Sequence, residues 1–420
     1  MRKFIFLLSV FSAFLLSQTA FTSQIEMWSS LCGSKEAARL DMFERWKKVE
    51  PNIEMKHLAV CSILDQNQKV ITSLATGNPP ELISNHYYFL PQYAALDALT
   101  PLDECLKKTG IDPSSTFLST TYDLNVFDGK LYGLPLFNTS RVLLYNKDLM
   151  REAGVDPNSP PRNWYELADM AKRLTKRNSD GSLNVSGFWA RDETVSSEMP
   201  KNLFYQLLWS AGGEIMNKDR TKVIYNSEAG YKALKFYADL INVHKVYDIG
   251  FGSGTKGGES PFYKNKAVML MGGPFDLVHI DRYRPDMDFG VTLLPAPSAG
   301  TSVPLIDSFA IMQMASAKNQ EGACKFVQFA ASKEAQVAFS KLSRRLPAHL
   351  EAVDLPEFKN DPVLNVFTEA LNNGRALPII PEWAEMEAVL ITEIQKTVMG
   401  KKSPRKALND AAKKVNNQVL

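Results

Sequence analysis

The chain has 420 residues, of which 22% are charged and 10% aromatic, and its formal net charge at pH 7 is +2. This balance provides no basic surface for nucleic acid, and no block of like charge marks an interaction tail. A chain of this length exceeds what one hydrophobic core usually organises, so we expect two or more lobes.

The N-terminus has the order of a secretory leader. Arg2 and Lys3 precede an apolar run over residues 4–16, and a small and polar stretch follows to residue 23. The run is shorter than the ~20 residues of a membrane-spanning helix. We therefore predict a signal peptide over residues 1–23 and a periplasmic protein, with an N-terminal membrane anchor as the alternative. Cys32 lies too far downstream for lipid attachment at the leader boundary.

The chain has four cysteines, Cys32, Cys61, Cys105 and Cys324. Their number is compatible with two disulfides in an oxidising compartment. We expect the pair Cys32–Cys61, because both residues follow short predicted strands that should be neighbours in one sheet. A zinc site and buried free thiols are the alternatives, although no Cys-x-x-Cys spacing supports zinc.

The first hundred residues alternate between strand and helix patterns. Strands are predicted over 24–28, 53–57 and 81–84, where apolar and polar residues alternate or an apolar run follows prolines. Between the first two lies a predicted helix over 34–49, with apolar residues at intervals of three: Ala37, Leu40, Phe43, Trp46 and Val49. A second helix ends at Gly77.

This alternation predicts a parallel sheet with right-handed crossovers. Ligands of such open sheets bind outside the carboxyl ends of the strands. Residues 28–30, 57–61 and 85–87 fall at these ends, so we expect binding residues among them.

Further along, a turn-rich break over 156–161 precedes a predicted helix over 162–174, and another apolar helix begins at 204. A glycine-rich stretch over 250–258 lacks the spacing of a phosphate-binding loop. Residues 288–295 read as an apolar strand that ends in a proline-rich loop, which suggests a segment crossing between lobes.

Several short motifs occur in a fixed order: Leu74-Ala-Thr-Gly-Asn-Pro-Pro-Glu81, Gly133-Leu-Pro-Leu-Phe-Asn-Thr-Ser-Arg141, Leu208-Trp-Ser-Ala-Gly-Gly-Glu214, Gly272-Gly-Pro-Phe275, Leu346-Pro347 and Pro381-Glu-Trp-Ala-Glu385. In this order the chain resembles the family 1 bacterial extracellular solute-binding proteins, the maltose-binding-like receptors of ABC importers. It departs from the family pattern at Phe275, where tryptophan is usual, at 305–308, and at Arg344 and Arg345.

The resemblance implies an α/β fold of the two-lobed periplasmic-binding-protein type (type II). Each lobe would be a mostly parallel sheet flanked by helices, with a hinge formed by interdomain crossovers. We place the N-terminal lobe at 24–137 plus 289–332, and the C-terminal lobe at 138–288 plus 333–420.

The resemblance also implies a function. The protein would bind a mono- or oligosaccharide between its lobes, close around it, and deliver it to ABC transporter permease subunits in the inner membrane. It would act as a monomer, without cofactor, metal or nucleic acid.

A sugar cleft needs aromatic platforms and planar polar side chains. The residues that the resemblance assigns to it are Trp28, Asn85, His86, Phe137, Asn138, Thr139, Arg141, Trp209, Phe275, Asp307, Arg345 and Trp383. Each also has a structural interpretation: the aromatic residues as core, the polar ones as caps or loop residues, and the arginines as surface charges.

Two alternative functions stay open. Arginine matches the geometry of carboxylate and phosphate, so Arg345 would suit glycerol 3-phosphate or another phosphorylated or acidic polyol. A secreted carbohydrate-active enzyme is the other alternative. No local catalytic motif supports it, and the five histidines are scattered.

Overall fold

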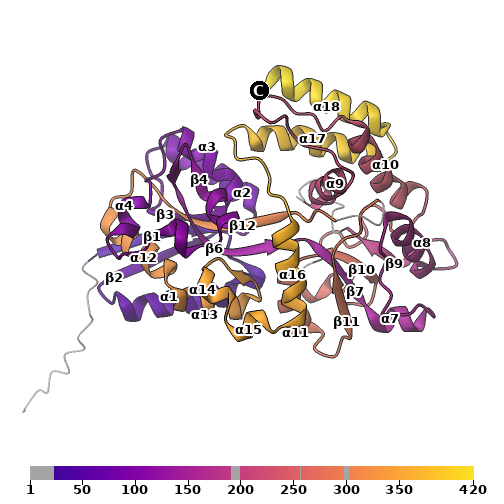
Figure 1. Cartoon of the computed structure of the whole chain (residues 1–420), viewed down its shortest axis with the longest axis horizontal. Helices are drawn as coiled ribbons and strands as arrows, with labels where there is room; N and C mark the ends of the chain where they lie inside the picture. The colour runs from indigo at the N-terminus through magenta and orange to yellow at the C-terminus, as the bar shows by residue number, and fades with distance from the viewer. Residues whose placement is uncertain (1–22, 191–198, 256, 298–301) are drawn as a thin grey trace, which may run out of the picture.

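The computed structural model describes residues 23–190, 199–255, 257–297 and 302–420. The chain folds into two lobes that lie side by side, each with a central sheet and flanking helices, as expected (Figure 1). The predicted signal peptide lies outside the described residues except for Ser23, which begins the first strand. None of the described helices combines the length and apolar character that crossing a membrane requires.

The sheet of the first lobe has six strands in the order β13-β6-β12-β3-β1-β2. Their bounds are β1 (Ser23–Ser29), β2 (Ile53–Ala59), β3 (Leu82–His86), β6 (Gly133–Ser140), β12 (Ile306–Gln313) and β13 (Leu346–Pro347). The predicted opening strands are therefore confirmed, and β1 pairs in parallel with β2 and β3.

The helices of this lobe come from two distant parts of the chain. Those near the N-terminus are α1 (Glu36–Val49), α2 (Ile63–Ala75), α3 (Leu90–Ala95), α4 (Asp103–Lys107), α5 (Pro113–Thr116) and α6 (Ser119–Tyr122). Helices α12 (Gln320–Ala331), α13 (Lys333–Ser343) and α14 (Leu350–Val353) join them, with α12 packed on α4 and α13 on α1.

Helix α1 buries only part of the predicted face: Trp46 is buried and Phe43 packs against the core, but the other predicted residues are exposed. Leu40 and Val49 are 52% and 60% exposed, whereas Ala38, Met42 and Trp46 are buried. The buried residues follow a spacing of four. Because the helix has 3.6 residues per turn, residues at a strict spacing of three move steadily around the helix axis and do not stay on one face.

The second lobe has a five-stranded sheet in the order β11-β7-β10-β9-β8. Its strands are β7 (Val142–Asn146), β8 (Lys176–Arg177), β9 (Leu183–Trp189), β10 (Ala267–Gly272) and β11 (Phe289–Thr292). Its helices are α7 (Lys147–Glu152), α8 (Trp164–Leu174), α9 (Met199–Ser210), α10 (Glu228–Asn242), α11 (Phe275–Tyr283), α17 (Trp383–Val398) and α18 (Pro404–Gln418).

Both sheets are mixed, which corrects the expectation that they are mostly parallel. Parallel pairing joins β1 to β2 and β3, and β9 to β10. Strands β6 and β12 pair antiparallel with each other, and β7 pairs antiparallel with β10 and β11. Strands β6 and β7 carry the chain into the second lobe and β11 and β12 carry it back, so β6 runs against β12 and β7 runs against β11.

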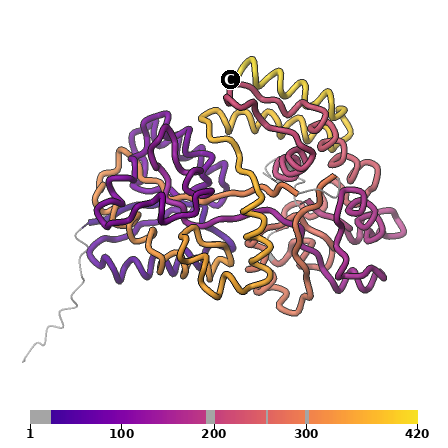
Figure 2. The backbone as a smooth tube through the Cα atoms, viewed as in Figure 1, coloured from indigo at the N-terminus to yellow at the C-terminus, as the bar shows by residue number. Residues whose placement is uncertain are grey.

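The same crossings move the predicted lobe boundaries. Residues 138–140 still belong to β6 of the first sheet, and β11 belongs to the second sheet, whereas the predicted first lobe includes 289–332. Helix α13 and β13 pack in the first lobe, whereas the predicted second lobe includes 333–420. Figure 2 follows the chain from β6 to β7, from β11 to β12, and upward from α16 (Pro362–Asn373) to α17.

A continuous apolar cluster joins the lobes. It runs from Tyr87 and Tyr88 of the first lobe to Tyr205, Trp209 and Trp383 of the second. Separate clusters cover the other faces of the two sheets. The two lobes are therefore in direct contact through a cluster that contains Trp28, Trp209 and Trp383 of the predicted site.

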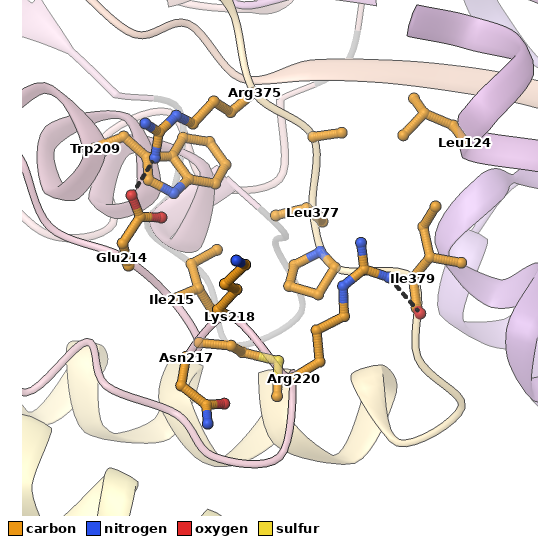
Figure 3. A pocket seen from close by; sticks show the side chains of 13 residues that line it. Leu124, Trp209, Glu214, Ile215, Asn217, Lys218, Arg220, Arg375, Leu377 and Ile379 are labelled. Atoms are coloured by element: carbon orange, nitrogen blue, oxygen red, sulfur yellow. Dashed lines mark hydrogen bonds and ion pairs between the residues drawn. The ribbon is translucent and has the colours of Figure 1, made fainter.

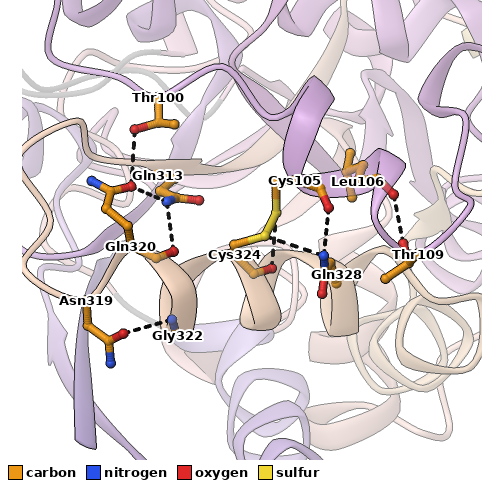
Figure 4. Close-up of a disulfide and its surroundings, with 10 residues drawn as sticks. All are labelled: Thr100, Cys105, Leu106, Thr109, Gln313, Asn319, Gln320, Gly322, Cys324 and Gln328. Carbon is orange, nitrogen blue, oxygen red and sulfur yellow. Dashed lines mark hydrogen bonds between the residues drawn. A yellow bond between two sulfur atoms is a disulfide. The ribbon is translucent and has the colours of Figure 1, made fainter.

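Two disulfides hold the first lobe. The predicted pair Cys32–Cys61 is confirmed, with 5.5 Å between the Cα atoms. Cys105 of α4 pairs with Cys324 of α12, and Gln328 donates to the Cys105 carbonyl oxygen at 2.6 Å beside it (Figure 4). The second bond joins segments that are 219 residues apart in sequence.

Candidate functional site between the lobes

Two arginines meet at one aromatic ring where the chain crosses between the lobes. Arg141 follows β6 directly, and its guanidinium carbon lies 5.1 Å from the centroid of the Phe275 ring. The guanidinium carbon of Arg345 lies 5.9 Å from the same ring. Phe275 begins α11, so this contact combines a crossing strand, the end of α13 and the second lobe.

Arg345 is 4% exposed, and its guanidinium has partners in the first lobe. It donates to the Ser343 carbonyl oxygen at 2.8 Å and to Ser34 Oγ at 3.0 Å. Burial, together with the neighbouring charge of Arg141, lowers the pKa of Arg345 to about 9, while the charge of Asp276 opposes the shift. Two buried cations close together favour an anionic or strongly polar neighbour.

A histidine and a carboxylate lie together at the ends of two first-lobe strands. His86 Nδ1 is 2.5 Å from Asp307 Oδ2, and both side chains are buried. The His86 ring stacks on Tyr88 with centroids 5.1 Å apart and meets Phe309 edge-on at 4.8 Å. Strands β3 and β12 are adjacent in the sheet, which brings together residues 221 positions apart.

Several predicted residues of the first lobe are engaged in packing. Phe137 stacks with Phe309 at 5.2 Å and with Phe339 at 5.5 Å, and the guanidinium carbon of Arg345 lies 5.0 Å from its ring centroid. Asn138 Oδ1 accepts from Thr121 Oγ1 at 2.8 Å. These contacts occupy both side chains, so the structure supports their structural interpretation.

The remaining predicted residues of the first lobe also make contacts within the protein. Trp28 donates from Nε1 to Glu26 Oε1 at 2.8 Å, and Lys69 of α2 lies over its ring at 4.6 Å from the centroid. Asn85 is fully buried in β3. Thr139 accepts from Arg141 Nη1 at 3.2 Å and so positions the guanidinium.

The aromatic residues of the second lobe form a connected group. Tyr205 of α9 stacks on Trp209 with centroids 5.9 Å apart, and it contacts Trp383 of α17 at the same distance. Trp383 is almost fully buried, whereas Trp209 lines a pocket of about 320 Å³. Trp209 is therefore the more accessible of the two predicted platforms.

This pocket lies between the lobes and the segment that joins them (Figure 3). Leu124 comes from the first lobe, residues 209 and 214–220 from the second, and residues 375–379 from the segment before α17. An ion pair between Arg375 and Glu214, 2.6 Å long, lies over Trp209, and Arg220 approaches the Ile379 carbonyl oxygen.

The structure adds residues that sequence reasoning missed. Lys35 Nζ lies 4.2 Å from the Phe309 ring centroid. Lys201 of α9 lies 5.4 Å from the Tyr88 ring centroid and forms a buried ion pair with Glu387 of α17. Tyr88 directly follows the strand end that was singled out, and Glu387 lies one helical turn after Trp383. No sequence signal identifies Lys201.

A family model for bacterial extracellular solute-binding proteins matches residues 34–337. A binding protein of Brucella abortus (strain 2308) is 28% identical over 350 residues, which cover 83% of this chain and 82% of the relative. The sn-glycerol-3-phosphate-binding periplasmic protein UgpB of Salmonella typhimurium (strain LT2) is 24% identical over 426 residues, covering 96% and 94%.

Solved structures agree on the fold. A solute-binding protein of Thermotoga lettingae bound to α-D-tagatose superposes with a TM-score of 0.83 at 22% identity, covering 94% of this chain and 99% of that one. A substrate-binding protein of Listeria monocytogenes in complex with cycloalternan gives 0.82 at 24% identity, covering 94% and 98%.

Proposed function

Because the chain belongs to the bacterial extracellular solute-binding proteins, we propose that it binds a carbohydrate between its lobes and delivers it to the permease of an ABC importer. The observation that carries this proposal is the convergence at the crossing segments. Arg141 at the crossing contacts Phe275 of the second lobe, and Trp209 belongs to the apolar cluster that joins the lobes. We assign His86 and Asp307, which pair at the strand ends of the first lobe, to the same site.

This set suits a sugar. The flat faces of aromatic rings cover the C–H faces of a pyranose, and the carboxylate, imidazole and guanidinium groups exchange hydrogen bonds with its hydroxyls. Such groups need not perform chemistry on the solute, and the family is one of binding proteins. The protein then acts as a periplasmic receptor and not as a catalyst.

The signal passed to the permease is a change of shape. Each lobe supplies part of the contacts, so a solute stabilises the closed arrangement in which both parts reach it. Contacts between the lobes are present in the structure, including the hydrogen bonds that Tyr87 makes with Leu377 on the segment before α17. A monomer in the periplasm satisfies this mechanism.

A second candidate ligand is a phosphorylated or acidic polyol. The specific observation that favours it is the pair of buried guanidinium groups, Arg141 and Arg345, at Phe275. The guanidinium group matches the geometry of phosphate and carboxylate. An anion between the two guanidinium groups would relieve their mutual repulsion. Relatives named for sn-glycerol-3-phosphate binding align over nearly the whole chain.

The test is a calorimetric titration of the mature protein after unfolding and refolding, which removes any co-purified solute. The probes are D-tagatose, maltose, mannobiose and glycerol 3-phosphate. Saturable binding of a neutral sugar that is insensitive to salt supports the first candidate. Binding of glycerol 3-phosphate that weakens with ionic strength supports the second.

Arg345→Met separates the two candidates further. Loss of the guanidinium should abolish phosphate binding, and it should reduce sugar binding only by the hydrogen bonds that are lost. A folded protein that binds none of the four probes would contradict both candidates.

A further inference from the structure

Lys201 and Glu387 form an ion pair in the second lobe, and their side chains are only 1% and 4% exposed. Lys201 lies on α9 and Glu387 on α17, two helices that pack together. The Lys201 ammonium also approaches the ring of Tyr88 from the first lobe, at 5.4 Å from its centroid. The pair therefore lies at the contact between the lobes.

The positions of the two residues align them with the aromatic group. Lys201 precedes Tyr205 by one turn of α9 and Trp209 by two, and Glu387 follows Trp383 by one turn of α17. Residues four apart share one face of a helix. Burial and the Glu387 charge both raise the pKa of Tyr205 well above its ordinary value, so the carboxylate lies within electrostatic reach of that ring.

Glu387 also reaches the first lobe electrostatically. Burial raises the pKa of Tyr87 well above its ordinary value, and the charges of Asp307 and Glu387 add to this shift. Two carboxylates, one from each lobe, thus act on the same tyrosine. Tyr88 connects the buried pair to His86 of the candidate site, because the Lys201 ammonium lies over the Tyr88 ring and the His86 ring stacks on it.

Stability of the fold does not explain this pair. Removing two charges from water costs about as much as their attraction returns, and apolar residues of similar size in the same place are often neutral or stabilising. The surroundings here are aromatic and apolar, including Tyr205 and Trp383. A buried ion pair in such surroundings, facing the other lobe, suggests a role in recognition.

We propose that Lys201 and Glu387 together recognise two neighbouring hydroxyl groups of the bound solute. The ammonium has only donors and the ionised carboxylate has only acceptors. One hydroxyl oxygen would accept from Lys201 Nζ while the adjacent hydroxyl donates to Glu387, with charge-assisted hydrogen bonds on both sides. This inference rests on the proposed function. It holds equally for a neutral sugar and for glycerol 3-phosphate, since both carry adjacent hydroxyls.

The experiment replaces the pair with apolar residues of similar size, Lys201→Met/Glu387→Leu. The ligand-free double variant should melt at the same temperature as the parent or higher. Its affinity for whichever of maltose, mannobiose, D-tagatose or glycerol 3-phosphate binds the parent should fall at least 100-fold. Glu393→Gln is the matched control, because Glu393 lies on the same helix and pairs with Lys402 away from Tyr88. Its affinity should stay within about twofold of the parent.

Analogues of the probe that lack one hydroxyl show whether Lys201 and Glu387 recognise neighbouring hydroxyls. Monodeoxy sugars, or propane-1,3-diol monophosphate in place of glycerol 3-phosphate, should bind the parent more weakly. At least one such analogue should bind the double variant no more weakly than the intact probe does. A purely structural pair would lower both affinities by the same factor.

The outcomes separate the two proposals. If the parent binds none of the probes, the proposed function is wrong and this inference falls with it. If the parent binds and the double variant keeps its affinity, only the role of Lys201 and Glu387 is wrong. If the double variant unfolds, Glu387→Gln decides: a folded protein with parental affinity and parental discrimination against the deoxy analogues overturns the inference.

Discussion

Arg344 and Asp281 form an ion pair across the two lobes, with Nε and Oδ2 3.2 Å apart. Arg344 ends α13 of the first lobe in the left-handed conformation, at φ 55°, and Asp281 lies on α11 of the second. The pair needs the lobes to be close, because its partners belong to different lobes. It therefore stabilises the contact between the lobes and not either lobe alone.

Asp281→Asn should weaken ligand binding modestly. The pair is partly exposed, and exposed pairs contribute about 0.2–1 kcal/mol, so we expect an affinity loss of at most about fivefold. Small-angle scattering should show a larger radius of gyration for the ligand-free variant than for the parent. Asp286→Asn, which removes a pair with Arg284 inside one lobe, is the control. Equal effects of both substitutions would contradict a role in closure.

His57 should make the stability of the protein pH-dependent. Its Nδ1 accepts from Arg39 at 3.0 Å, since guanidinium has only donors, and its Nε2–H donates to Ser29 Oγ at 2.8 Å. Burial and the Arg39 charge lower the pKa of His57 from 6.5 to about 4. Between these values the unfolded chain binds a proton that the native state does not, so the free energy of unfolding decreases as pH falls from 6.5 towards about 4.

Urea denaturation of the parent and of His57→Gln, at pH about 7 and about 4.5, tests this. The parent should lose more stability between the two pH values than the variant does. The same loss in both proteins would show that other groups cause the acid sensitivity.

The Cys105–Cys324 disulfide should contribute more stability than Cys32–Cys61. It closes a loop of 219 residues, against 29 for the other bond. By loop-closure entropy these correspond to about 5 and about 4 kcal/mol. Urea midpoints of Cys105→Ser/Cys324→Ser and of Cys32→Ser/Cys61→Ser measure the difference. The reverse order would show that loop length does not govern the stability of this lobe.

The two predicted tryptophan platforms should respond differently to truncation. Trp383 is 1% exposed, so Trp383→Ala should cost about 3–5 kcal/mol of stability by leaving a cavity. Trp209 lines the pocket between the lobes, so Trp209→Ala should reduce affinity for the bound probe by about tenfold or more. Thermal unfolding and calorimetric titration of each variant measure the two effects. A Trp383→Ala protein of parental stability would contradict the core assignment.

Local sequence patterns determined the elements. The alternation over 53–57 and the helical pattern over 162–174 predicted β2 and α8 to within a few residues, because hydrophobic periodicity is a property of the segment itself. The ordered motifs also led to the correct family. The spacing of three in α1 predicted the wrong residues, since the burial of Met42 in place of Leu40 depends on the segments that pack on this helix, among them β2, α12 and α13.

Tertiary structure alone decided which residues meet. The direction of β6 and β12, the return of α13 to the first lobe and the pairing of Cys105 with Cys324 all follow from crossings between the lobes. Lys201 and Glu387 are 186 residues apart, and no local sequence pattern predicts that α9 and α17 pack side by side. Sequence by itself determined the elements, the two-lobed fold and the kind of protein. Which side chains face the solute depends on contacts between distant segments, which only the folded chain brings together.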